Sequence, residues 1–177
     1  MSEKQRPDCI SHWTEIESPD DSCYRGYDEL LAIGAPLARH FGLTRIGIHH
    51  ERLPPGRRTS FPHAESLEEE FVYVIEGTPD VWLDGELHRL QAGDSVGFPA
   101  GTGQAHTFIN NSDADVRLLI VGEVSKPENR IYYPKHEEMQ TSRPDWWSDP
   151  PQRPLGDHDG LPDTLRASQV ADTNRKE

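Results

Sequence analysis

Two glutamates and a histidine in the middle of the chain have the types and spacing of ligands for a metal ion. His63 and Glu65 are two residues apart, so in a strand their side chains point to the same face. Glu70 begins the apolar segment EFVYVIEG, in which Val72 and Val74 share its face. If that face is the interior, Glu70 is a buried carboxylate, which requires a partner such as a metal ion.

A second histidine, His106 in GQAHTFIN, shares a strand face with Phe108 and could reach the same interior point from a later strand. Each histidine could instead be an ordinary core or surface residue. Glu65 could be a direct ligand, a hydrogen-bond acceptor behind the ligands, or an exposed group. Glu68 and Glu69 are expected to form a solvated turn.

The elements that must position these residues are short strands. Apolar runs alternate with Gly, Pro, Asn and Asp turns, a pattern that predicts an all-β fold rather than a helical bundle. Asp84-Gly85 predicts a two-residue hairpin turn that places Trp82 opposite Leu87. The predicted strands cover residues 43–53, 60–65, 70–77, 80–84, 86–90, 95–99, 105–110 and 116–123.

The pattern divides the chain into a barrel over residues 42–124 and two irregular extensions. Residues 1–41 are expected to pack on the barrel, with a helical turn from Asp28 and a break at Gly34 to Pro36. Residues 125–177 form a Pro-rich arm with a frayed last dozen residues. The aromatics of this arm are expected to cover the barrel or a partner subunit, namely Tyr132, Tyr133, Trp146 and Trp147.

Length and charge narrow the class of protein. The 177 residues suggest one domain, and 18 Lys and Arg against 31 Asp and Glu give a net charge of −13. Such acidity argues against binding to nucleic acid or to an anionic membrane surface. No apolar run is long enough to span a membrane, and Cys9 and Cys23 form no disulfide framework. We therefore expect a soluble cytoplasmic protein.

Two spaced motifs resemble those of the cupin superfamily. Residues Gly56 to Gly77 read G-x6-H-A-E-x4-E-x6-G, which is similar to the first cupin motif. Residues Gly93 to Asn110 read G-x5-P-x-G-x4-H-x3-N, which is similar to the second. The resemblance implies a double-stranded β-helix, a small jelly-roll barrel with a metal at its mouth. It extends over residues 42–124, and wider similarity in the chain resembles uncharacterised bacterial single-domain cupins.

The resemblance also implies a ligand set. His63, Glu70 and His106 match the motif positions, whereas Glu65 stands where the family usually has a second histidine. The turn GTGQAH is two residues longer than usual. We expect all four side chains to hold one divalent ion per chain, either Mn, Fe, Ni or Zn, because imidazoles with carboxylates suit these metals.

The expected function is that of a small-molecule metalloenzyme, either a dioxygenase or an isomerase or lyase acting on a sugar or carboxylic acid. The alternatives are a small-ligand-binding or sensing module without catalysis, and a structural barrel with a vestigial site. Four retained ligand-capable side chains argue against a vestigial site, and the sequence has no helix-turn-helix pattern. Fold resemblance alone does not define the reaction.

The remaining expectations concern neighbouring residues and assembly. His49 and His50 are adjacent and face opposite sides of a strand, so at most one points into the barrel. Arg57 and Arg58 are expected to be solvated, or else to clamp an anionic substrate. The strand FVYVI is apolar on both faces, so its outer face requires a cover, either the C-terminal arm or a second subunit. We expect a homodimer.

Overall fold

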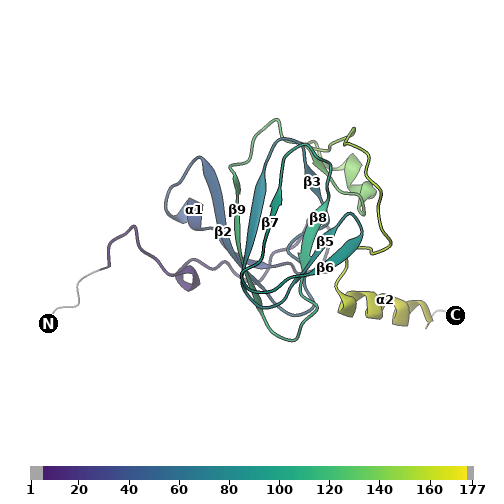
Figure 1. Ribbon diagram of the computed structural model, residues 1–177, viewed down its shortest axis with the longest axis horizontal. Coiled ribbons are helices and arrows are strands. Elements are labelled where there is room, and N and C mark those ends of the chain that lie inside the picture. Colours follow the sequence, from purple (N-terminus) through teal and green to yellow (C-terminus); the bar gives the residue numbers. More distant parts are fainter. Residues whose placement is uncertain (1–5, 175–177) are drawn as a thin grey trace.

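The computed structural model describes residues 6–174 and has two principal antiparallel sheets that face each other as a jelly-roll double-stranded β-helix (Figure 1). One sheet has the strand order β1-β2-β9-β4-β7, the other the order β6-β5-β8, and β10 pairs with β3. The strands are β1 (Ile33–Ala35), β2 (Ile46–Leu53), β3 (Ala64–Glu65), β4 (Glu70–Glu76), β5 (Asp80–Leu83), β6 (Glu86–Arg89), β7 (Ser95–Phe98), β8 (His106–Ile109), β9 (Val116–Glu123) and β10 (Ile131–Tyr132).

The eight strands predicted from the sequence are all present, from β2 to β9. The predicted hairpin is confirmed, because Trp82 of β5 lies opposite Leu87 of β6. Its two turn residues, Asp84 and Gly85, have φ angles of 47° and 96°, which a two-residue turn matching the twist of the strands requires. The strand predicted over 60–65 is shorter than expected, since only Ala64 and Glu65 form β3.

The prediction of a helical turn beginning at Asp28 is wrong. Residues 28–32 are irregular, and the next three form β1, whose Ile33 and Ala35 are buried. The cluster LLAI is apolar without a clear period, so it fits a short strand as well as a helix. The helix begins only after Pro36, as α1 (Leu37–His40), which Figure 1 shows beside β2.

The C-terminal region is also more ordered than predicted. Residues 137–141 form a 3-10 helix, and α2 (Asp163–Asn174) occupies most of the segment that was expected to fray. Pro162 precedes α2, and Asp163 in its first turn favours the helix dipole. Among the described residues, no helix has both the length and the apolar character needed to cross a membrane.

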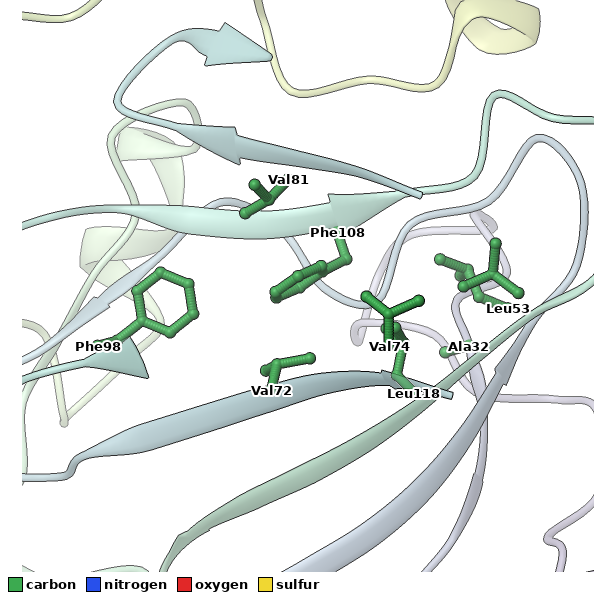
Figure 2. Packing of buried hydrophobic residues seen from close by; sticks show 9 residues of the cluster. Ala32, Leu53, Val72, Val74, Val81, Phe98, Phe108 and Leu118 are labelled. Carbon is green, nitrogen blue, oxygen red and sulfur yellow. The ribbon is translucent and has the colours of Figure 1, made fainter. Parts of the chain in front are cut away.

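The core lies between the two sheets. Val72 and Val74 of β4 are at most 1% exposed, and Figure 2 shows them on the opposite side of the core from Phe108 of β8. Leu53 of β2 and Leu118 of β9 complete the same cluster and are fully buried. Burial of each such side chain stabilises the fold by about 1.5–3 kcal/mol.

A buried ion pair attaches both terminal segments to the barrel. Arg58 is fully buried and donates two hydrogen bonds of 2.7 Å to the Glu29 carboxylate. It also donates to the carbonyl oxygen of Gly160, at 2.9 Å, and its guanidinium lies 4.5 Å from the centre of the Phe61 ring. One side chain therefore links residues before, within and after the barrel.

We expect Glu29→Gln to lower the free energy of unfolding by about 3 kcal/mol, because the Arg58 charge would remain buried without a carboxylate. Urea unfolding at neutral pH measures this loss. The matched control is Asp20→Asn at the Arg57–Asp20 pair, whose side chains are 19% and 48% exposed. There the loss should stay within about 1 kcal/mol. Equal losses in both variants would contradict the role given to Arg58.

The outer face of the five-stranded sheet is only partly covered. Trp13 stacks on His50 of β2 with ring centres 4.3 Å apart. Phe71, Tyr73 and Ile75 of β4 remain 43%, 40% and 37% exposed. The C-terminal aromatics do not cover them, since Tyr133 and Trp146 pack in the Phe61 cluster. Within the described residues, the C-terminal arm therefore does not cover this strand.

We propose that a second copy of the chain covers this face, because three adjacent apolar side chains on one strand remain in water. Light scattering at micromolar concentration should give twice the chain mass of 20.1 kDa. Tyr73→Asp should shift the mass towards the monomer. Leu155→Asp, at a 42% exposed position on the C-terminal segment, should not. A monomer mass for the unaltered protein would reject the dimer.

Candidate functional site

A cavity of 210 Å³ opens inside the barrel where β4 and β8 begin. Three of the four predicted ligands contribute to its wall, and they come from separate elements: His63 directly before β3, Glu70 at the start of β4 and His106 at the start of β8. The other lining residues are His49, Glu51, Thr59, Ser60 and Ile120.

The two histidines are brought together by the backbone. The His63 amide donates to the His106 carbonyl oxygen at 3.1 Å, and the His106 amide donates to the His63 carbonyl oxygen at 2.9 Å. Their ring centres are 4.9 Å apart. Phe98 stacks on the His106 ring at 3.5 Å with an interplanar angle of 8°, which orients that imidazole. The pair of rings is therefore positioned by the barrel wall.

Each imidazole has its Nδ1 atom near a backbone carbonyl oxygen. His63 Nδ1 lies 3.0 Å from the Phe61 carbonyl oxygen, and His106 Nδ1 lies 3.5 Å from that of Gln104. A ring that donates from Nδ1 to a carbonyl can bind a metal through Nε2. In His106 that Nε2 atom lies against Glu70. Burial and the neighbouring His106 lower the pKa of His63 to about 4, so this imidazole is neutral at pH 7.

Glu70 is the carboxylate closest to this pair. Its Oε1 atom lies 3.2 Å from His106 Nε2. Burial alone would raise the pKa of Glu70, but the hydrogen bond with His106 and the electrostatic effect of the neighbouring histidines outweigh burial and hold this pKa below its usual range. Glu70 is therefore an ionised, electron-donating group at neutral pH.

Glu65 lies apart from the other three predicted ligands. It lines an adjoining cavity of 110 Å³, to which Glu70 also contributes, but it does not line the cavity of the two histidines. Burial, together with the charges of Glu68 and Glu70, raises the pKa of Glu65 to about 7. The structure thus brings His63, Glu70 and His106 to one cavity and places Glu65 next to it.

Two residues of β2 also line this cavity, although the sequence assigned neither of them to it. His49 lines the cavity whereas His50 is on the outer face, as expected for adjacent strand residues. Glu51 also lines the cavity and was not predicted, although its i+2 relation to His49 and to the buried Leu53 signals the same face.

Arg57 and Arg58 do not line the cavity. Arg57 pairs with Asp20, and Arg58 is buried against Glu29 rather than solvated. Neither residue therefore clamps an anionic substrate in this cavity. This result corrects the expectation of two solvated arginines, because a guanidinium with a bidentate carboxylate partner can be buried.

The donor atoms suit a divalent metal ion. Two imidazoles and an ionised carboxylate are the ligand types that Mn, Fe, Ni and Zn accept. The 3.2 Å between His106 Nε2 and Glu70 Oε1 matches two ligands of one ion, since bonds of about 2.1 Å at right angles span about 3 Å. Within residues 6–174, however, no three His, Cys, Asp or Glu side chains are gathered closely enough to hold an ion as they stand.

Glu51 has an unusual environment for a carboxyl group. Its Oε2 atom is buried and has no hydrogen-bond partner in the described part of the chain. Burial and the charge of Glu70 raise the pKa of Glu51 to about 8. The native protein therefore keeps this group protonated at pH values where the unfolded chain has already lost the proton.

This pKa shift predicts a stability that falls with rising pH. Between about pH 5 and pH 8 the unfolded state binds fewer protons at Glu51 than the native state does, so the metal-free protein should lose on the order of 3 kcal/mol. Urea unfolding in EDTA at pH 5.5 and pH 8.5 measures the loss. Glu51→Gln should reduce this dependence and leave the part due to Glu65, whose pKa is also raised, whereas Glu86→Gln on the surface of β6 should not change it. A parent protein equally stable at both values would contradict the assignment.

Comparison with known proteins agrees with this fold. Residues 49–122 match the family described as Cupin domain. A segment of 65 residues is 40% identical to the polyketide synthase CurC of Streptomyces cyaneus, covering 37% of this chain and 40% of that protein. The same length is 38% identical to protein SchB of Streptomyces halstedii, covering 45% of it. The chain thus spans less than half the length of these curated relatives.

Two solved structures have the same fold. A sugar phosphate isomerase of the cupin superfamily from Silicibacter pomeroyi is 34% identical, with a TM-score of 0.56 over 58% of this chain and 64% of that one. The polyketide cyclase RemF of Streptomyces resistomycificus is 20% identical, with a TM-score of 0.58 over 77% of this chain and 94% of that one. Residues 49–122 thus match a cupin domain, and the chain shares its fold with a solved member of the cupin superfamily.

Proposed function

We propose that the protein is a metal-dependent enzyme acting on a small oxygen-bearing molecule. The observation that supports this most is the meeting of His63, Glu70 and His106 at one cavity from three separate elements. A surface or core role for these residues would not require them to share a cavity. Perturbed ionisable groups in a concave site are typical of catalysis.

His63, Glu70 and His106 would hold one divalent ion, with Glu65 as a fourth ligand from the adjoining cavity. When bound, the ion would polarise an oxygen of the substrate. The chain's own residues have distinct tasks: the Phe61 carbonyl orients His63, and the Phe98 ring orients His106. Glu70 supplies the negative charge that a divalent ion requires.

The reaction we favour is isomerisation, cyclisation or a lyase reaction next to a carbonyl group. Relatives in sequence and structure carry the names polyketide synthase, polyketide cyclase and sugar phosphate isomerase. Proton transfer beside a carbonyl is common to these chemistries. A dioxygenase is the second candidate, and the separation of Glu65 from the main cavity favours it, because two His and one carboxylate with open positions are the ligand set of non-haem iron oxygenases.

Metal content tests the proposal. Protein purified without added metal should contain close to one divalent ion per chain by elemental mass spectrometry. His106→Ala should lower this content at least about tenfold, because it removes a nitrogen donor, while circular dichroism should still report a β protein. Full metal occupancy in that variant would refute the assignment.

Two further variants sharpen this experiment. His88→Ala removes a histidine whose side chain is 51% exposed on β6, and it should leave the metal content unchanged. Glu65→Gln keeps the size of the side chain but removes its charge, so it should weaken metal affinity if Glu65 is a ligand. An affinity equal to that of the parent would restrict the ligand set to His63, Glu70 and His106.

A further inference from the structure

The walls of the two joined cavities carry no side chain with a fixed positive charge. Neither the 210 Å³ cavity nor the adjoining 110 Å³ cavity is lined by an Arg or Lys among the described residues. The smaller cavity is strongly acidic, and its carboxylates are those of Glu65, Glu68, Glu69, Glu70 and Glu123. Lys126 neutralises only Glu123, at 2.6 Å. An anionic ligand would therefore meet carboxylates on this side of the site.

Glu51 supplies a second, independent feature of the inner wall. Along β2 it follows His49 on the inward face and precedes Leu53, which is fully buried in the core. Its Oε2 atom is buried and has no partner in the described part of the chain. A buried carboxyl oxygen without a hydrogen bond is costly, and a ligand that offers a hydroxyl group or a carbonyl oxygen would supply the missing partner.

The volume of the larger cavity and its other lining residues limit the size and the chemistry of the ligand. A volume of 210 Å³ exceeds the 150 Å³ or so that accommodates benzene, so the cavity has room for about one substituted six-membered ring. Thr59 and Ser60 add hydroxyl groups to its wall, and Ile120 adds an apolar surface. These lining groups can recognise an uncharged molecule by hydrogen bonds and contact.

We propose that this cavity binds an uncharged, hydroxyl- or carbonyl-bearing molecule in preference to a phosphate or carboxylate, and that Glu51 hydrogen-bonds to its oxygen. The proposal rests on the function proposed above, since it assigns the substrate class of the same cavity. It separates this protein from an enzyme for sugar phosphates, because recognition of a phosphate calls for Arg, Lys or a helix N-terminus. Arg52, Arg57 and Arg58, which are near lining residues in sequence, are engaged with Glu17, Asp20 and Glu29.

Three probes of equal size and different charge test this assignment: 3-hydroxybenzyl alcohol, 3-hydroxybenzoate and 3-hydroxybenzylamine. Their binding to the zinc-loaded and to the EDTA-treated protein is measured by ligand-observed NMR at pH 7. In the EDTA-treated protein we expect the alcohol to bind at least about tenfold more tightly than the benzoate. The difference should be smaller in the zinc-loaded protein, because the ion attracts the carboxylate. Tighter binding of the benzoate or the amine, or no binding of any probe at 10 mM, would overturn the proposal.

Variants separate the contribution of Glu51 to binding from that of the carboxylates that line the smaller cavity. Glu51→Leu should weaken binding of the alcohol at least about tenfold, whereas Glu51→Gln, which retains hydrogen-bonding atoms, should stay within about threefold of the parent. Glu69→Lys, at an exposed position in the wall of the smaller cavity, should strengthen benzoate binding at least about threefold and leave binding of the alcohol unaffected. Glu76→Gln, outside both cavities, is the control for all probes. Unchanged alcohol binding in Glu51→Leu would overturn the role of Glu51.

The outcome is independent of the test for metal. A preference for the alcohol in the EDTA-treated protein, together with the absence of metal after purification, would support this inference and refute the metalloenzyme. Full metal content together with preferred benzoate binding would support the metalloenzyme and refute this inference.

Discussion

The register of the central strands is the constraint on which the site depends. Val72 and Val74 of β4 are buried in the core, and because side chains alternate along a strand, Glu70 must face the same interior. A slip of one residue would bury Phe71 and Tyr73 and turn Glu70 towards solvent. On β2, the buried Leu53 directs Glu51 and His49 inward in the same way. Apolar packing at one end of each strand thus positions polar groups at the other.

The cavity inside the barrel is lined by two carboxyl groups with unequal surroundings. Glu70 Oε1 lies 3.2 Å from His106 Nε2, whereas the buried Oε2 atom of Glu51 has no partner in the described part of the chain. Such an arrangement costs stability, because each desolvated carboxyl must either remain protonated or find a positive charge. Arg58 is also buried, but the fold gives it a bidentate carboxylate and a carbonyl oxygen as hydrogen-bond partners. Buried polar groups that lack a partner in a native protein are concentrated where ligands bind.

Relatives with different names share this architecture. The same fold occurs in a sugar phosphate isomerase and in a polyketide cyclase, so the barrel itself does not determine the reaction. Differences in the reaction must arise from the side chains that line the two cavities. In this protein those side chains are acidic or uncharged, and the neighbouring arginines pair with the N-terminal segment instead. The extension of the chain before the barrel therefore influences the charge available to the site.

Local sequence determined the barrel strands and three of the residues that meet at the cavity. Alternating apolar residues, the Asp84-Gly85 turn and the motif spacing are short-range signals, and they predicted β2 to β9 together with His63, Glu70 and His106. Tertiary structure alone decided which groups share a wall. Glu51 comes from a strand outside both motifs, and Glu65 lies in the adjoining cavity although it is two residues from His63. Strand periodicity gives the face of a sheet, whereas distance across a barrel depends on how its strands pack.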